Sequence, residues 1–173
     1  CTSEEHGEID VSSGGKGKLT IAISGARNAA STYSVASVGR EDEFNDLTIY
    51  MFDLTSGTLE NIFSGGSISY GTSSAGGTTA TIDVTERTGG KVLFFVANTA
   101  GVAAKLADAK YGQTAIGEFQ QTISDELTGL PDAPMLMSAK VAIDDIENPG
   151  GDIAVSLQRR VARFDVDNDA DIT

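Results

Sequence analysis

The residues of this chain that could do chemistry are few and lie far apart in the sequence. Its only histidine, His6, falls in a polar stretch over residues 1–16 that reads as a flexible tether. A Ser–His or Cys–His arrangement is therefore not expected in a folded core. The chain contains no CxxC pair, no HExxH motif and no P-loop; the glycines before Lys16 lack the Walker spacing. This inventory predicts no enzyme activity and no cofactor.

Two acidic clusters are the remaining candidates for chemistry. Asp165, Asp167 and Asp169 alternate along the chain, which resembles the opening of a calcium loop. That loop would also need a glycine at its sixth position and a glutamate at its twelfth, and neither is present. The alternative is a solvated strand exit or linker. Asp144 and Asp145 could serve acid–base catalysis, or they could form a solvated turn.

Cys1 is the only cysteine, so no disulfide can form within the chain. A cysteine at the first position is what remains when a bacterial lipoprotein signal is removed and the thiol is acylated. The following residues then form a polar tether leading away from the lipid. The alternative is that the sequence begins at an arbitrary point.

Length and charge limit the class of protein. A chain of 173 residues with 40% hydrophobic residues can bury the core of one domain, and 20 glycines indicate many turns. The net charge of −13 argues against binding to nucleic acid or to an anionic membrane surface. No apolar run reaches the length of about 20 residues that spans a membrane.

The clearest strand lies over residues 17–24. Leu19, Ile21 and Ile23 alternate with small polar residues, which is the period of a half-buried strand. Gly25 ends it, and Arg27 follows in a run of small residues that reads as a loop.

Further strands are expected along the rest of the chain. Residues 91–97 are continuously apolar and predict a strand buried on both faces. Residues 64–77 read as a mobile loop with at most a short edge strand, and residues 101–128 as one or two short helices. In the last element the apolar parity changes between Leu157 and Phe164, which predicts a bulge or a kink between two sheets. The other expected strands cover residues 45–53, 59–63, 78–84 and 135–143, with the last one starting at 153.

These elements predict an all-β fold, an antiparallel Greek-key β-sandwich of about seven strands (transthyretin-like), with one or two short helices after the central buried strand. Residues 1–16 would be the tether and residues 17–168 a single sandwich domain. Residues 169–173 would begin a linker.

Several of these stretches together resemble the N-terminal domain of fimbrillins, the subunits of bacterial type V pili. The resemblance rests on the following segments: Cys1, Lys18-Leu-Thr-Ile-Ala-Ile-Ser24 with Gly25-Ala-Arg27, Leu47-Thr-Ile-Tyr-Met-Phe52, Lys91-Val-Leu-Phe-Phe-Val-Ala-Asn98, Met135-Leu-Met-Ser-Ala-Lys140 and Leu157-Gln-Arg-Arg-Val-Ala-Arg163. It covers about residues 1–168. Fimbrillins have two sandwich domains, so residues 169–173 would lead to a second domain that this sequence lacks.

The resemblance implies a function and a mechanism. Fimbrillins are exported to the outer membrane as lipoproteins acylated on the N-terminal cysteine, here Cys1. An arginine-specific, trypsin-like protease cuts after the first strand, at the position matching Arg27, or alternatively at Arg40. The strand carrying Leu19, Ile21 and Ile23 leaves, and a strand from another fimbrial subunit replaces it.

Two functions therefore remain open at this point. The first is a structural subunit that polymerises by donor-strand exchange. The alternative is a surface lipoprotein, such as a pilus anchor, tip or adhesin, that binds an extracellular ligand through its loops. The Gly/Ser-rich loop over residues 64–77, which contains Tyr70, is the candidate for that binding.

Overall fold

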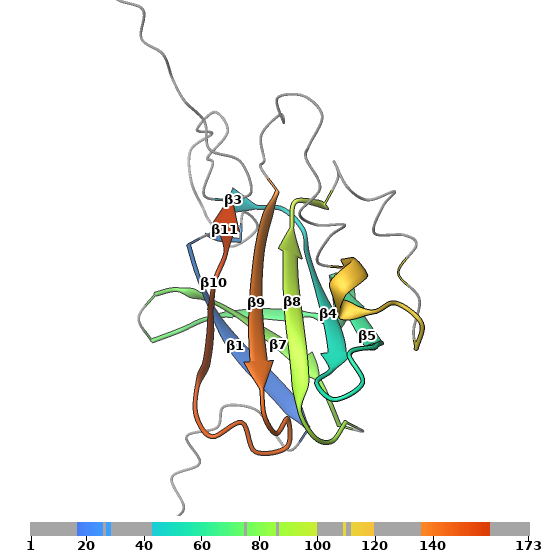
Figure 1. Ribbon diagram of the computed structural model, residues 1–173. Coiled ribbons are helices and arrows are strands. Elements are labelled where there is room, and N and C mark those ends of the chain that lie inside the picture. Colours follow the sequence, from blue (N-terminus) through green and yellow to red (C-terminus); the bar gives the residue numbers. More distant parts are fainter. Residues whose placement is uncertain are drawn as a thin grey trace, which may run out of the picture.

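The computed structural model contains two β-sheets packed face to face (Figure 1). It describes residues 17–25, 27–28, 43–74, 76–85, 87–99, 109, 112–119 and 136–159. The four-stranded sheet has the order β10 (Ile153–Ser156), β1 (Lys18–Ser24), β7 (Thr78–Asp83), β6 (Ser69–Thr72). The five-stranded sheet has the order β11 (Gln158–Arg159), β9 (Met137–Ile143), β8 (Lys91–Ala97), β4 (Leu47–Asp53), β5 (Leu59–Ser64). A separate pair joins β2 (Arg27–Asn28) to β3 (Glu43–Phe44).

The all-β sandwich predicted from the sequence is confirmed, and each of the seven expected strands is present. Beyond them the structure adds β6, the short edge strand allowed for in residues 64–77, and the two-residue strands β2, β3 and β11. Two pairings differ from the expectation of an antiparallel fold: the short strands β2 and β3 pair in parallel, and within the sandwich β1 pairs with β10 in parallel. The strands β1 and β10 come from opposite ends of the chain, so no local pattern could indicate their relative direction.

β8 lies in the interior of the five-stranded sheet and is buried along its whole length, as its continuous apolarity predicts. One face of the strand, which includes Leu93 and Phe95, contributes to the core between the sheets. The other face, which includes Phe94, belongs to a second apolar cluster. Phe119 covers that cluster from a helical turn at residues 116–119, with its ring centroid 5.4 Å from that of Phe94.

The last described strands pass from one sheet to the other at Leu157. β10 belongs to the four-stranded sheet, whereas β11, which begins one residue after Leu157, pairs with β9 in the five-stranded sheet. This is a kink between two sheets of the predicted kind. The kink was predicted from the change of apolar parity between Leu157 and Phe164, and Phe164 itself lies outside the described residues.

The helices expected over residues 101–128 fall mostly outside the described residues, which contain only the turn at 116–119. A three-residue 3₁₀ turn, η2 (Gly65–Ser67), precedes β6. In the part of the chain that the structure describes, no helix is long and apolar enough to cross a membrane.

Candidate functional site

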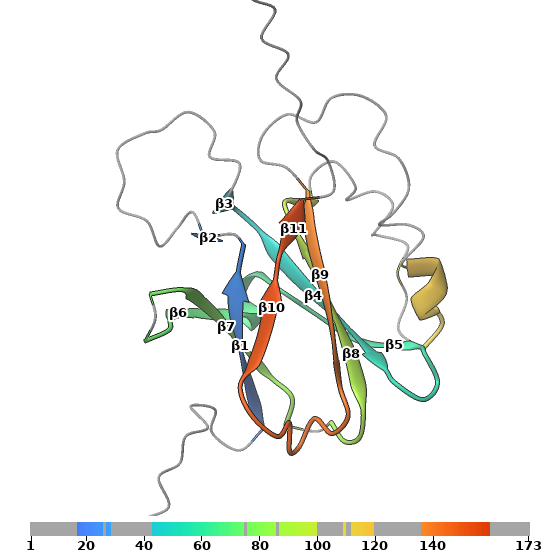
Figure 2. The same ribbon diagram turned by 60° about the vertical axis from the view of Figure 1, so that its left-hand side comes forward.

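The first strand, β1, lies in the interior of the four-stranded sheet (Figure 2). Ile21 pairs with Ile153 of β10 on one side and with Ala80 of β7 on the other. The β7 pairing extends from Lys18 to Ile23, whereas the parallel β10 pairing begins only at Ile21. Removing β1 would thus unpair the facing edges of two strands and leave a gap between them. Removing an edge strand would unpair only one.

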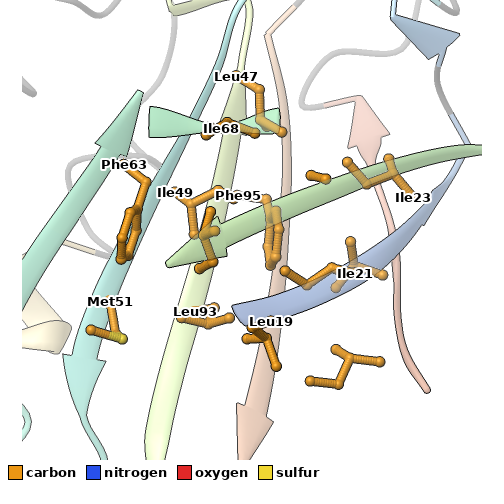
Figure 3. Close-up of a cluster of buried hydrophobic side chains, with 14 of the residues drawn as sticks. Leu19, Ile21, Ile23, Leu47, Ile49, Met51, Phe63, Ile68, Leu93 and Phe95 are labelled. Atoms are coloured by element: carbon orange, nitrogen blue, oxygen red, sulfur yellow. The ribbon is translucent and has the colours of Figure 1, made fainter. Parts of the chain in front are cut away.

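The apolar face of β1 contributes directly to the core between the sheets. Leu19, Ile21 and Ile23 are 4%, 0% and 4% exposed. Figure 3 shows the three side chains pointing into the cluster that contains Ile49 and Phe95 of the facing sheet. The strand therefore supplies three side chains to a shared core, and its loss would open an apolar trough.

The opposite face of β1 is polar and is tied to its neighbours. The hydroxyls of Thr20 and Thr81 lie 2.8 Å apart, and the Ser24 hydroxyl donates to the carbonyl of Val155 at 3.2 Å. Lys18 is the register partner of Asp83. Hydrogen bonds from the Thr85 hydroxyl and backbone N–H lower the pKa of Asp83, and the charge of Lys18 adds to the effect.

A glycine with positive φ stands at each end of β1. Gly17 has φ +89° and accepts a hydrogen bond from the Val84 N–H at 2.6 Å. A Cβ at Gly17 would lie 2.5 Å from the Thr85 hydroxyl oxygen, and one at Gly25 (φ +78°) would collide with the carbonyl oxygen of Leu157. Only glycine fits either position without strain.

Arg27 lies in β2, which corrects its expected placement in an unpaired loop. The backbone of β2 pairs in parallel with β3, and Arg27 is the register partner of Glu43. The two paired strands directly precede and directly follow residues 29–42 in the sequence. The other candidate for cleavage, Arg40, lies between them and outside the described residues.

Asn98, directly after β8, holds β3 and the start of β4 in place. Its side chain is buried, its φ is +59°, and its amide nitrogen donates to the Glu43 carbonyl at 3.1 Å. Its side-chain oxygen accepts the N–H of Asn45 at 3.0 Å. This role of Asn98 is not expected from the sequence. An asparagine directly after a buried strand is the available signal, because asparagine tolerates positive φ better than most residues.

Most of the other predicted site residues lie outside the described residues: Cys1 and the aspartates at 165, 167 and 169. The same holds for His6, for which no site was expected. Asp144 and Asp145 are in the β9–β10 connection, where Asp145 accepts the N–H of Glu147 at 3.0 Å. They form the solvated turn that was one of the two interpretations. The described residues contain no cluster of three or more acidic, histidine or cysteine side chains that could hold a metal.

Tyr70, the candidate for ligand binding through the 64–77 loop, is on β6. It is 40% exposed, and its ring centroid lies 6.1 Å from that of Phe44. Partial burial, followed by the charge of Asp46, raises the pKa of Tyr70. Tyr70 is therefore partly engaged with the edge of the core.

No protein-family model matches the sequence, and no curated protein sequence matches it. Three solved structures are similar to the chain. A fimbrial assembly protein from Parabacteroides distasonis is 11% identical, with a TM-score of 0.48 over 82% of this chain and 52% of that one. A candidate cell adhesion protein from the same organism is 18% identical, with a TM-score of 0.47 over 83% and 46%. The tip fimbrial protein Mfa3 from Porphyromonas gingivalis, in a C-terminally truncated form, is 17% identical, with a TM-score of 0.42 over 82% and 48%.

The chain spans about half the length of each of these three structures. Two of the three are fimbrial proteins by description.

Proposed function

We propose that this chain is a structural subunit of a bacterial surface fimbria that is cut after an arginine and polymerised by donor-strand exchange. In this proposal β1 occupies the position that a strand from a neighbouring subunit takes in the polymer. The observation that carries the proposal is the interior place of β1, with a paired strand on each side and three core side chains.

The energetics of β1 favour replacement over simple loss. Burying Leu19, Ile21 and Ile23 contributes about 1.5–3 kcal/mol each, or about 5–9 kcal/mol together. The open gap would also leave the edges of β7 and β10 unpaired and exposed to pairing with another strand. A cut chain would therefore hold its first strand until a competing strand of similar pattern displaced it.

Arg27 remains the preferred cleavage position, with Arg40 as the alternative. Cleavage after Arg27 would separate β1 from the rest of the sandwich in one step and leave it attached by non-covalent contacts alone. Because the Arg27 backbone pairs with Glu43, a protease would have to open this two-residue pair first. Cleavage after Arg40 would release β2 along with β1.

Export as a lipoprotein, acylation of Cys1 and display at the outer membrane belong to the same proposal, on the strength of the sequence resemblance. Mass spectrometry of the protein from intact cells tests this part separately. We expect a diacyl or triacyl mass on the peptide that begins at Cys1. An unmodified thiol there would remove the lipid anchor from the proposal.

Limited proteolysis of the folded protein tests the cleavage. An arginine-specific protease should cut once within residues 27–40 before it cuts elsewhere, and the product should form oligomers on size exclusion. Arg27→Lys and Arg40→Lys keep the charge and remove each site in turn, while Arg87→Lys is the matched control. If the double variant Arg27→Lys/Arg40→Lys were cut and assembled like the wild type, the polymerising role would fail, leaving the anchor, tip or adhesin as the function.

A further inference from the structure

The outer face of the four-stranded sheet contains a hollow of about 490 Å³ that lies away from the core. It extends across all four strands and takes in the turn between β6 and β7. Its lining residues are Thr20, Ala22, Gly71, Thr72, Ser73, Ser74, Thr79, Thr81, Asp152 and Ile153. A hollow of this size falls within the range of small-molecule sites.

Small side chains keep the hollow open. Among the described residues, the floor carries no aromatic ring and no long side chain, and Gly71 is the register partner of Thr79. A Cβ at Gly71 would lie 2.9 Å from the Thr79 hydroxyl oxygen, closer than real contacts of this kind. A larger residue at Gly71 would therefore push into the hollow or displace Thr79.

The chemistry of the lining is dominated by hydroxyl groups. Four threonines and two serines supply them, and Asp152 supplies a carboxylate at the start of β10. Two of the threonines, Thr20 and Thr81, lie within hydrogen-bond distance of one another. Among the described residues, the side chains of Thr79 and Asp152 have no hydrogen-bond partner, so both can bond to a ligand.

Charge narrows the class of ligand. Among the described residues that line the hollow there is no lysine or arginine, and the one charged side chain, Asp152, is negative; the chain as a whole carries −13. A phosphate, a sulfate or an acidic sugar would thus meet repulsion with no compensating cation. One carboxylate among hydroxyls is too little to hold a divalent cation, which takes six or more oxygen ligands, several of them charged.

We propose that this hollow binds a neutral carbohydrate. Sugar hydroxyls both donate and accept, which matches the threonine and serine hydroxyls, and a carboxylate accepts from two neighbouring sugar hydroxyls at once. The methyl groups of Ala22 and of the threonines offer apolar contact to the C–H face of a ring, whereas the Ile153 side chain belongs to the core between the sheets. The site is separate from the cleavage and strand exchange proposed above, and it gives the uncut subunit a means of adhesion.

The test uses the full, uncut chain against a panel of neutral oligosaccharides built from mannose, galactose or N-acetylglucosamine, together with sialylated and sulfated counterparts. Saturation-transfer NMR followed by titration calorimetry gives the affinity. We expect at least one neutral oligosaccharide to bind, with a Kd of about 1 mM or below. Preference for the sialylated or sulfated forms, or no binding to any probe, would overturn the proposal.

Matched variants locate the site. Asp152→Asn and Thr79→Val each remove hydrogen-bonding capacity with little change in shape, and each should weaken binding about tenfold. Asp144→Asn, on the same β9–β10 connection but outside the hollow, should bind as the wild type does. Equal binding by wild type and by the double variant Asp152→Asn/Thr79→Val would place the ligand elsewhere and refute the site. Because the chain stays uncut throughout, neither result bears on strand exchange.

Discussion

Lys91, the first residue of β8, is a charged residue with only 3% of its surface exposed, and it pairs with Asp53 at the end of β4, next to the β4–β5 turn. Its ammonium nitrogen lies 3.0 Å from Asp53 Oδ2 and 2.9 Å from Glu60 Oε2. Asp53 Oδ1 in turn accepts the backbone N–H groups of Thr55 and Ser56 at 3.0 and 2.7 Å. One cation thus joins three adjacent strands to the hairpin turn.

Replacing this cation should weaken the fold more than replacing an exposed one. Lys91→Met leaves two neighbouring carboxylates without a counter-charge. Since these are 25% and 27% exposed, we expect a loss of about 1–3 kcal/mol in unfolding free energy, below that of a fully buried pair. Lys140→Met, whose exposed ammonium lies 5.7 Å from the Phe94 ring centroid, should lose less than about 1 kcal/mol. Equal urea midpoints for the two variants would contradict this assignment.

The same cluster predicts a dependence of stability on pH. The Ser56 N–H, followed by the hydrogen bond with Lys91, lowers the pKa of Asp53 from 3.8 to about 2. A carboxyl group whose pKa is lower in the folded state than in the unfolded state stabilises the fold fully at a pH above its unfolded-state pKa. This stabilisation is lost as the pH falls through the folded-state pKa. Burial acts to lower the pKa of Lys91, but hydrogen bonds with Glu60 and Asp53 raise it overall, so its contribution persists up to pH 10.5 and is lost above that.

We therefore expect the difference in unfolding free energy between wild type and Asp53→Asn to stay constant from about pH 5 to 8. It should narrow between about pH 4 and pH 2. The lowered pKa of Asp83 affects both proteins equally and cancels in the difference. Chemical denaturation at a series of pH values measures it. A difference that stayed the same down to pH 2 would show that Asp53 is not stabilised as its geometry indicates.

At the scale of elements, strand identity could be predicted from the sequence and strand pairing could not. Alternation at Leu19, Ile21 and Ile23 indicates a strand with one buried face, and β1 has that burial pattern. Continuous apolarity indicates β8. The parallel pairing of β1 with β10, and of β2 with β3, depends on residues distant in the chain, and no local pattern encodes it.

The candidate site was predictable to a similar extent. The burial of its apolar residues could be predicted from their spacing. The proposed cleavage at Arg27 depended on the resemblance to a family. The β2–β3 pair was not foreseen because two-residue strands have no periodicity. The bridging role of Asn98 depends on a tertiary hydrogen bond to the Glu43 carbonyl, which the sequence alone does not specify.

Asn98 gives a prediction for the β3–β4–β8 junction. Asn98→Gly keeps the positive φ but loses the side-chain hydrogen bonds with Asn45 and Glu43, which should cost about 1–2 kcal/mol in unfolding free energy. Asn98→Ala also strains the backbone and should cost about 1 kcal/mol more. The exposed Asn148→Ala should stay within about 0.5 kcal/mol of wild type. If Asn98→Ala were as stable as Asn98→Gly, the backbone part of this explanation would be wrong.

At the scale of the whole molecule, the four-stranded sheet brings two proposals together at one strand. The inner face of β1 carries the core side chains proposed to be exchanged, and Thr20 and Ala22 on its outer face line the hollow. A replacement strand would have to place apolar residues inward and small residues outward to preserve both. The pattern of β1, large inside and small outside, meets that condition.

The most direct test of strand exchange is uptake of a labelled strand by the cut protein. The protein is first cleaved after Arg27 by an arginine-specific protease and purified with its fragment still bound. A fluorescent peptide of residues 16–27 is then added, and bound label is measured by size exclusion over time. We predict uptake by the cut protein, none by the uncut protein, and none of a peptide carrying Ile21→Asp, because Ile21 is 0% exposed in the core. Failure of the cut protein to take up the wild-type peptide, or equal uptake of the Ile21→Asp peptide, would contradict donor-strand exchange at β1.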